Sequence, residues 1–151
     1  MRRFLLPLIL SLCTSTAAIA ADGVIDVKSA HSVSVTADRL ENILKKKGMT
    51  VFARIDHAAG AKKAGKKLRP TELVIFGNPK VGTPLMKCSQ SIAIDLPQKA
   101  LIWKDADGNV WLSYNDPQHL VARHNTQGCE KVIKKVTGAL AKFSSKATAA
   151  E

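Results

Sequence analysis

Apolar and polar residues alternate along three segments in the first half of the chain, and this two-residue period predicts strands of a sheet. The segments are GVIDVK from Gly23, MTVFARIDH from Met49 and TELVIFG from Thr71. In the second segment His57 falls in step with the apolar residues, so we expect its ring to be buried with them. Farther on, KALIWK and VWLSYN flank DADGN, whose Asp-Gly pair is typical of a β-hairpin turn.

A period near 3.6 residues predicts a long helix between the first two strands. Leu40, Ile43 and Leu44 share one helical face, and Gly48 supplies a residue that commonly ends a helix. The start is open between two residues with suitable side chains for an N-cap, Ser32 and Thr36.

The remaining pattern predicts shorter elements and one more long helix. AAGAKKAGKKLRP, which follows His57, indicates a short helix or a loop. Thr83 followed by Pro84 predicts the N-cap and first residue of a short helix, and NDPQHLVAR predicts another. The last helix is expected from about residue 129 to residue 143, with its apolar residues on one side and SSKATAAE as a frayed tail.

This order of elements indicates an α+β fold. We expect a mostly antiparallel sheet with two long helices on one face, because that arrangement buries both apolar sides in two layers. Residues 21–146 are predicted to form this single domain, and residues 147–151 a disordered tail.

The first twenty residues have the three parts of a secretory signal peptide. Two arginines precede an apolar run, and the segment ends in Ala18-Ile19-Ala20. The run is shorter than the roughly 20 apolar residues that a membrane span requires. We therefore predict cleavage near Ala20 and a periplasmic or secreted mature protein.

The chain is strongly basic, with 23 Lys and Arg against 12 Asp and Glu and a formal net charge of +11. Such a charge favours contact with anions, anionic surfaces or nucleic acid. Nucleic acid is not expected as a partner, because the lysines are dispersed, aromatic residues are few and no zinc-finger spacing is present. A transient contact with anionic surfaces is predicted through four lysines that should be exposed: Lys62, Lys63, Lys66 and Lys67.

Two cysteines, Cys88 and Cys129, remain after the predicted cleavage. An even number of cysteines in an exported chain favours a disulfide, and two buried free thiols are the alternative.

Several blocks of the sequence resemble domain-of-unknown-function family 302. They are ARIDHAAGA, LRPTELVIFGNPKVGTPLM, IDLPQKALIW and DGNVWLSYNDPQHLVARH, and the resemblance runs from about Val24 to His124. It implies a compact α+β fold similar to the TATA-box-binding-protein-like arrangement of a sheet covered by helices. It implies neither DNA binding nor an established activity.

The chain shows no nucleophile elbow, no HExxH, no phosphate loop and no redox cysteine pair, which disfavours an enzyme. Its four histidines are scattered, and a metal site across the fold would combine His57 with His124 or Asp56. A small anion is an alternative ligand, because GNPK leads into a predicted helix whose N-terminus would face it. In that hypothesis His57, Asn78 and Lys80 line one pocket.

Three classes of function follow from these features. The first is an exported module that binds a small anion or a metal ion, through His57, Asn78 and Lys80 in the case of the anion. The second is a structural or interaction protein, including a homodimer formed through a sheet edge or a helix face. The third is a hydrolase that uses His57. No cofactor is indicated.

Overall fold

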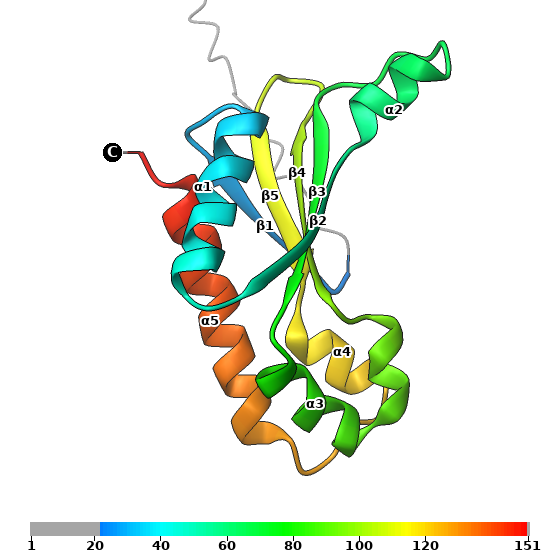
Figure 1. Ribbon diagram of the computed structural model, residues 1–151, viewed down its shortest axis with the longest axis vertical. Helices are drawn as coiled ribbons and strands as arrows, with labels where there is room; N and C mark the ends of the chain where they lie inside the picture. Colours follow the sequence, from blue (N-terminus) through cyan, green and yellow to red (C-terminus); the bar gives the residue numbers. More distant parts are fainter. Residues whose placement is uncertain (1–21, 151) are drawn as a thin grey trace, which may run out of the picture.

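The computed structural model describes residues 22–150, so the predicted signal peptide lies outside the described residues. Its centre is a five-stranded antiparallel sheet with the strand order β1-β5-β4-β3-β2 (Figure 1). The strands are β1 (Val24–Ser29), β2 (Thr50–Asp56), β3 (Thr71–Gly77), β4 (Gln98–Lys104) and β5 (Val110–Asn115). Strands β2 to β5 are neighbours in chain order, whereas β1 pairs with β5 alone. The predicted strands and the predicted hairpin are confirmed.

Two long helices, α1 (Val33–Lys46) and α5 (Glu130–Thr148), pack side by side over one face of the sheet (Figure 1). Ser32 begins α1, because its hydroxyl accepts a hydrogen bond from the Val35 backbone N–H at 3.3 Å. The core between sheet and helices contains fully buried apolar side chains from both layers, among them Leu40, Leu44, Val74, Phe76, Ile102 and Leu112. The predicted α+β class, with an antiparallel sheet and two helices on one face, is therefore confirmed.

Helix α5 is longer than the sequence pattern predicted. It continues to Thr148, and Ala147 and Thr148 are 0% and 4% exposed, so these two residues belong to the core and not to a frayed tail. Arg39 of α1 donates hydrogen bonds to the Ala147 and Lys146 carbonyls, which otherwise lack helical partners at this end. The sequence pattern did not predict this last part of α5, because its residues are mostly small and show no clear helical repeat of large apolar side chains.

A smaller group of helices lies at one end of the sheet (Figure 1). It consists of α3 (Pro79–Cys88), the 3-10 helix η1 (Gln90–Ile94) and α4 (Pro117–Arg123). Helix α3 begins at Pro79, not at Pro84 as predicted: Asn78 caps the Lys80 N–H at 2.9 Å and Pro84 lies inside the helix. The disulfide between Cys88 and Cys129 joins the end of α3 to the start of α5, as predicted.

Helix α2 (His57–Lys63) lies at the opposite end of the sheet and projects away from the main body (Figure 1). It has no buried residue, and Asp56 caps it by accepting a hydrogen bond from the Ala59 N–H at 2.8 Å. No helix within residues 22–150 combines the length and apolar character that crossing a bilayer requires.

Candidate functional site

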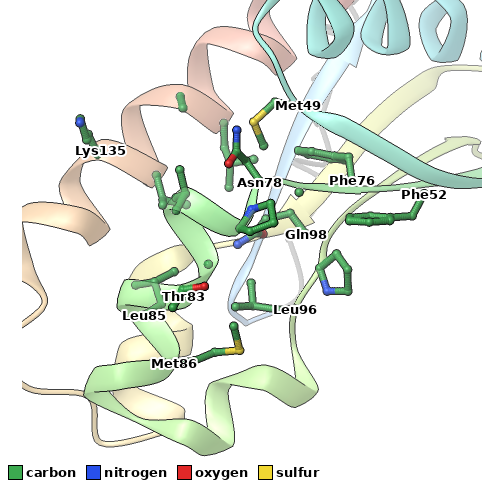
Figure 2. Close-up of a pocket in the computed structure, with 18 of the residues that line it drawn as sticks. Met49, Phe52, Phe76, Asn78, Thr83, Leu85, Met86, Leu96, Gln98 and Lys135 are labelled. Atoms are coloured by element: carbon green, nitrogen blue, oxygen red, sulfur yellow. The ribbon is translucent and has the colours of Figure 1, made fainter.

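An open cavity of about 490 Å³ lies between α3, α5 and the ends of strands β2, β3 and β4 (Figure 2). Its lining is mostly apolar and includes two methionines and three phenylalanines. These side chains are Met49, Met86, Phe52, Phe76 and Phe143. Volumes of about 300–1,000 Å³ with predominantly apolar walls are typical of small-molecule sites.

Local sequence signals position the walls of this cavity. Asn78 lies between β3 and α3, and its side chain donates from Nδ2 to the Gly48 carbonyl at 2.9 Å while its Oδ1 accepts from the Lys80 N–H as the cap of α3. Gly82, on the first turns of α3, also lines the cavity, and a Cβ there would stand 3.8 Å from Leu96 Cδ1. The glycine therefore leaves room that an ordinary side chain would occupy.

One polar side chain inside the cavity stands out because it has no partner. Gln98 is only 9% exposed and shares the helix-covered face of β4 with Ala100 and Ile102. Within the described part of the chain, no hydrogen bond involves its side-chain amide, although the residue lines the cavity (Figure 2). The amide atoms are open to the cavity and are not bonded to the protein, so a ligand in the cavity can form hydrogen bonds with them.

His57 does not lie where the sequence predicted. It is exposed because β2 ends at Asp56 and His57 begins α2, a helix that has no buried residue. The antiparallel register pairs Thr50 with Gly77, whereas Asp56 pairs with Glu72. His57 is thus at the end of the strand pair remote from the cavity, and the prediction of a buried ring was wrong.

The predicted pocket of His57, Asn78 and Lys80 is consequently not formed. Asn78 does line the cavity, but its side chain is already engaged in the cap and in the bond to Gly48. Lys80 is exposed and is not among the lining residues. The anion hypothesis placed a helix N-terminus at Thr83, where the structure has the middle of α3.

The other histidines lie at separate places in the fold and do not form a common site with His57. His31 Nε2 lies 2.8 Å from the Ala149 carbonyl, and His119 packs against the backbone of Gly23. His57 on α2 and His124 after α4 lie at opposite ends of the sheet (Figure 1), so the predicted metal pairing of these two residues is wrong. Within residues 22–150, no group of three or more His, Cys, Asp or Glu side chains is arranged to hold a metal ion.

Sequence reasoning missed a hydrogen-bonded chain of polar residues beside the small helices. Ser91 Oγ lies 3.0 Å from His124 Nδ1, and His124 Nε2 lies 2.6 Å from Asp95 Oδ2. Arg123 donates to the other oxygen of the same carboxylate at 3.1 Å. The residues are up to 33 positions apart in the sequence, so only the packing of η1 against the end of α4 brings them together.

Two further groups have strongly perturbed electrostatics. Arg54 joins β2 to neighbouring elements by ion pairs to Glu72 and Asp38 at 2.5 Å each, and the hydrogen bond to Glu72 is the main cause that raises its pKa. The Trp111 indole N–H, assisted by Asn109, lowers the pKa of Asp105 to about 2. Both groups stabilise the sheet and lie outside the cavity lining.

The four lysines of the projecting segment are exposed, as predicted. Lys62 and Lys63 belong to α2, whereas Lys66 and Lys67 follow it, so the helix does not gather all four on one face. Their contact with anionic surfaces stays a prediction.

Comparison with known proteins gives one family and one class of named relatives. The family described as "Domain of unknown function DUF302" matches residues 25–143. "Fluoride-specific ion channel FluC 1" of Brucella suis biovar 1 (strain 1330) is 51% identical over 109 residues, which are 72% of this chain and 43% of that protein. The protein of the same name from Brucella abortus biovar 1 (strain 9-941) is 51% identical over 109 residues, 72% of this chain and 40% of that protein.

The chain therefore spans less than half the length of these curated relatives. Among solved structures, "Crystal structure of uncharacterized conserved protein DUF302 from Bacillus stearothermophilus" aligns with a TM-score of 0.75 and 19% sequence identity. The alignment covers 84% of this chain and 99% of that one. At this identity the likeness establishes the fold alone.

Proposed function

The chain belongs to the DUF302 family, and we propose that within this fold it binds a small, largely apolar ligand in the cavity between α3, α5 and the sheet. The observation that carries the proposal is the amide of the largely buried residue Gln98, which is open to the cavity, has no protein partner in the described chain and borders an apolar space. The ligand would place one hydroxyl or carbonyl group against this amide and its hydrocarbon part against the methionines and phenylalanines.

The lining supports an apolar ligand over the anion and the metal ion that the sequence suggested. Transfer of a small, strongly hydrated ion such as fluoride or phosphate into an apolar space costs free energy unless charged partners replace its water. Lys135 is the cationic residue of the lining, and it lies on α5 at the edge of the cavity with its side chain exposed (Figure 2). The name of the Brucella relatives refers to fluoride, so that ion belongs among the probes tested.

The experiment compares 1-octanol with n-octane, which has the same hydrocarbon chain but no hydroxyl. Both are titrated into the wild-type protein and into Gln98→Leu, with binding followed by the shift in melting temperature and by calorimetry. Sodium fluoride and sodium phosphate, each against sodium chloride at equal ionic strength, serve as anion probes.

Octanol should stabilise the wild-type protein, and its affinity should fall about fivefold in Gln98→Leu, because a neutral hydrogen bond contributes about 1 kcal/mol. Octane should bind Gln98→Leu at least as well as wild type, since it loses no partner. Absence of any octanol binding would overturn the proposal, as would stabilisation by fluoride or phosphate alone, which would favour the anion hypothesis.

The projecting lysines support a second candidate function, attraction to anionic surfaces. Lys62, Lys63, Lys66 and Lys67 are exposed on a segment that extends from the body of the domain (Figure 1). Replacing all four by Gln should reduce co-sedimentation with anionic phospholipid vesicles at low salt, and salt should reduce wild-type binding in the same way. Equal binding of both proteins at low salt would reject this role.

We also propose that the domain acts in the periplasm after cleavage near Ala20. The basic and apolar leader and the cysteine pair support this location, because disulfides persist in oxidising compartments. N-terminal sequencing of the exported protein tests it, and a retained leader would contradict it.

A further inference from the structure

We propose that Ser91 is the nucleophile of a second, hydrolytic site, with His124 as its general base and Asp95 as the positioning residue. The three side chains form one continuous chain, with 3.0 Å from Ser91 Oγ to His124 Nδ1 and 2.6 Å from His124 Nε2 to Asp95 Oδ2. A nucleophile bonded to a base, and the base bonded to a group that orients it, is the arrangement that activates a serine hydroxyl.

The two contacts of His124 impose a single set of proton positions on a neutral ring. A carboxylate only accepts hydrogen bonds, so Nε2 carries the proton that it donates to Asp95. Nδ1 then has a free electron pair and accepts the hydrogen bond from the Ser91 hydroxyl. The geometry therefore directs the basic nitrogen of the neutral ring at the serine hydroxyl.

Burial separates the roles of the three residues. The side chains of His124 and Asp95 are 7% and 11% exposed, whereas Ser91 is exposed and open to a substrate. Low solvent access strengthens the interaction between the carboxylate and the imidazolium that forms during reaction.

Several covalent and polar links hold the two segments that carry these residues. The disulfide lies close to both, since Cys88 precedes Ser91 by three residues and Cys129 follows His124 by five. Ser89 donates a hydrogen bond to the His124 carbonyl at 3.1 Å, and Asn125, directly after the histidine, has a φ of 46°. Asn commonly takes this left-handed conformation directly after a helix, and the bond from the Thr126 N–H to the Val121 carbonyl at 3.0 Å closes the end of α4 beside His124.

The surroundings of Ser91 indicate the substrate class. In a 3-10 helix the side chains at i and i+3 are aligned, so Ile94 shares the side of η1 that carries Ser91. Ile94 is 74% exposed, an unusual position for a large apolar side chain. An ester with a short apolar acyl group could place that group against Ile94 and its carbonyl carbon at Ser91.

The reaction is an ester hydrolysis that needs only water as a co-reactant. Ser91 Oγ forms a bond to the carbonyl carbon while its proton moves to His124 Nδ1. The ester C–O bond then breaks, and the alkoxide leaves with that proton as an alcohol. Water, deprotonated by His124 Nδ1, attacks the acyl-serine. The bond to Oγ then breaks, the carboxylic acid is released, and Nδ1 returns the proton to Oγ, which restores Ser91 and the neutral imidazole.

The test uses 4-nitrophenyl butyrate hydrolysis and labelling by diisopropyl fluorophosphate, with the labelled residue located by peptide mass spectrometry. The variants are Ser91→Ala, His124→Gln and Asp95→Asn, and Ser145→Ala is the matched control because Ser145 is an exposed serine on α5 outside this chain of side chains. Circular dichroism and melting temperature establish that each variant folds. Ser91 is exposed, so its replacement by Ala should not unfold the domain.

Wild type and Ser145→Ala should be labelled at Ser91 and should hydrolyse the ester, whereas Ser91→Ala should lose both properties. Folded Asp95→Asn should be slower and should have an altered pH–rate profile, which a purely structural role of the carboxylate would not produce. Equal hydrolysis by Ser91→Ala and wild type, or labelling at another residue, would overturn the proposal and leave the three side chains as a link between η1 and α4.

Discussion

Gly82 is the residue at which a single substitution should separate stability from ligand binding. It lies within α3, and its backbone conformation does not require a glycine, since the left-handed glycines are at other positions. Its missing side chain would point toward Leu96 across the cavity. Gly82→Leu should therefore fill part of the proposed ligand site without breaking the helix.

The expected gain in stability has two parts. Replacing glycine inside a helix contributes about 0.5–1 kcal/mol. A fully buried leucine side chain contributes about 1.5–3 kcal/mol, and roughly half of that applies here because the cavity is open on one side. The sum is about 2 kcal/mol, which corresponds to roughly 6–10 °C in melting temperature for a domain of this size.

Gly138 provides the matched control. It lies in α5, and a Cβ there would meet no atom within 4 Å, so Gly138→Leu gains only the helical contribution, about 0.5–1 kcal/mol. Differential scanning calorimetry should therefore place Gly82→Leu above Gly138→Leu and both above wild type. Octanol should raise the melting temperature of Gly138→Leu as it does for wild type, and should not raise that of Gly82→Leu.

Two results would refute this reasoning. If Gly82→Leu melts below wild type, the space beside α3 does not admit a leucine. If it binds octanol with wild-type affinity, the ligand lies elsewhere in the protein.

Three further predictions concern the links that hold the domain together. Replacing both Cys88 and Cys129 by Ala should lower the free energy of unfolding by about 4 kcal/mol for a sequence separation of 41 residues, measured by urea denaturation; an unchanged midpoint would contradict this. Arg54→Met should lower the free energy of unfolding by about 1.5–3 kcal/mol in the same assay, because it leaves the largely buried Glu72 carboxylate without its charged partner. This difference from wild type should disappear at a pH low enough to protonate Glu72. Asp105 has a lowered folded-state pKa, so its stabilisation is present above its ordinary pKa near 4 and is lost as the pH falls toward 2; Asp105→Asn should flatten the decline in melting temperature over that window, and an equally steep decline would contradict the assignment.

The sequence predicted the sheet well because its strands carry a strong two-residue period and its hairpin a specific turn. The start of α3 was misplaced because Asn78-Pro79 and Thr83-Pro84 present the same local signal, a capping side chain followed by proline. Each pair places a capping side chain directly before a proline, as is common at the first turn of a helix. Only the hydrogen bond from Asn78 to Gly48, which depends on the pairing of β2 with β3, shows which pair begins the helix.

The candidate sites were harder to predict for a related reason. The alternation that placed His57 inside the protein applies only within a strand, and β2 ends at Asp56, so His57 begins a helix without buried residues. Gln98 has no sequence feature that distinguishes it from an ordinary polar residue at a strand start. Its importance arises from the empty space beside it, which is a property of the packed helices and sheet.

The pairing of β1 with β5 has a consequence for how the chain reaches its native state. Val24 is opposite Asn115, so the first strand has no partner until almost the whole domain is available. The four other strands are successive neighbours along the chain, and the segments of 14, 20 and 5 residues that connect them are far shorter than the 80 residues between β1 and β5. Contacts between distant parts of a chain slow folding, because the entropy of closing a long loop is lost before the contacts form. Placement of β1 is therefore expected to be a late event, during which the edge of β5 is open to pairing with another chain.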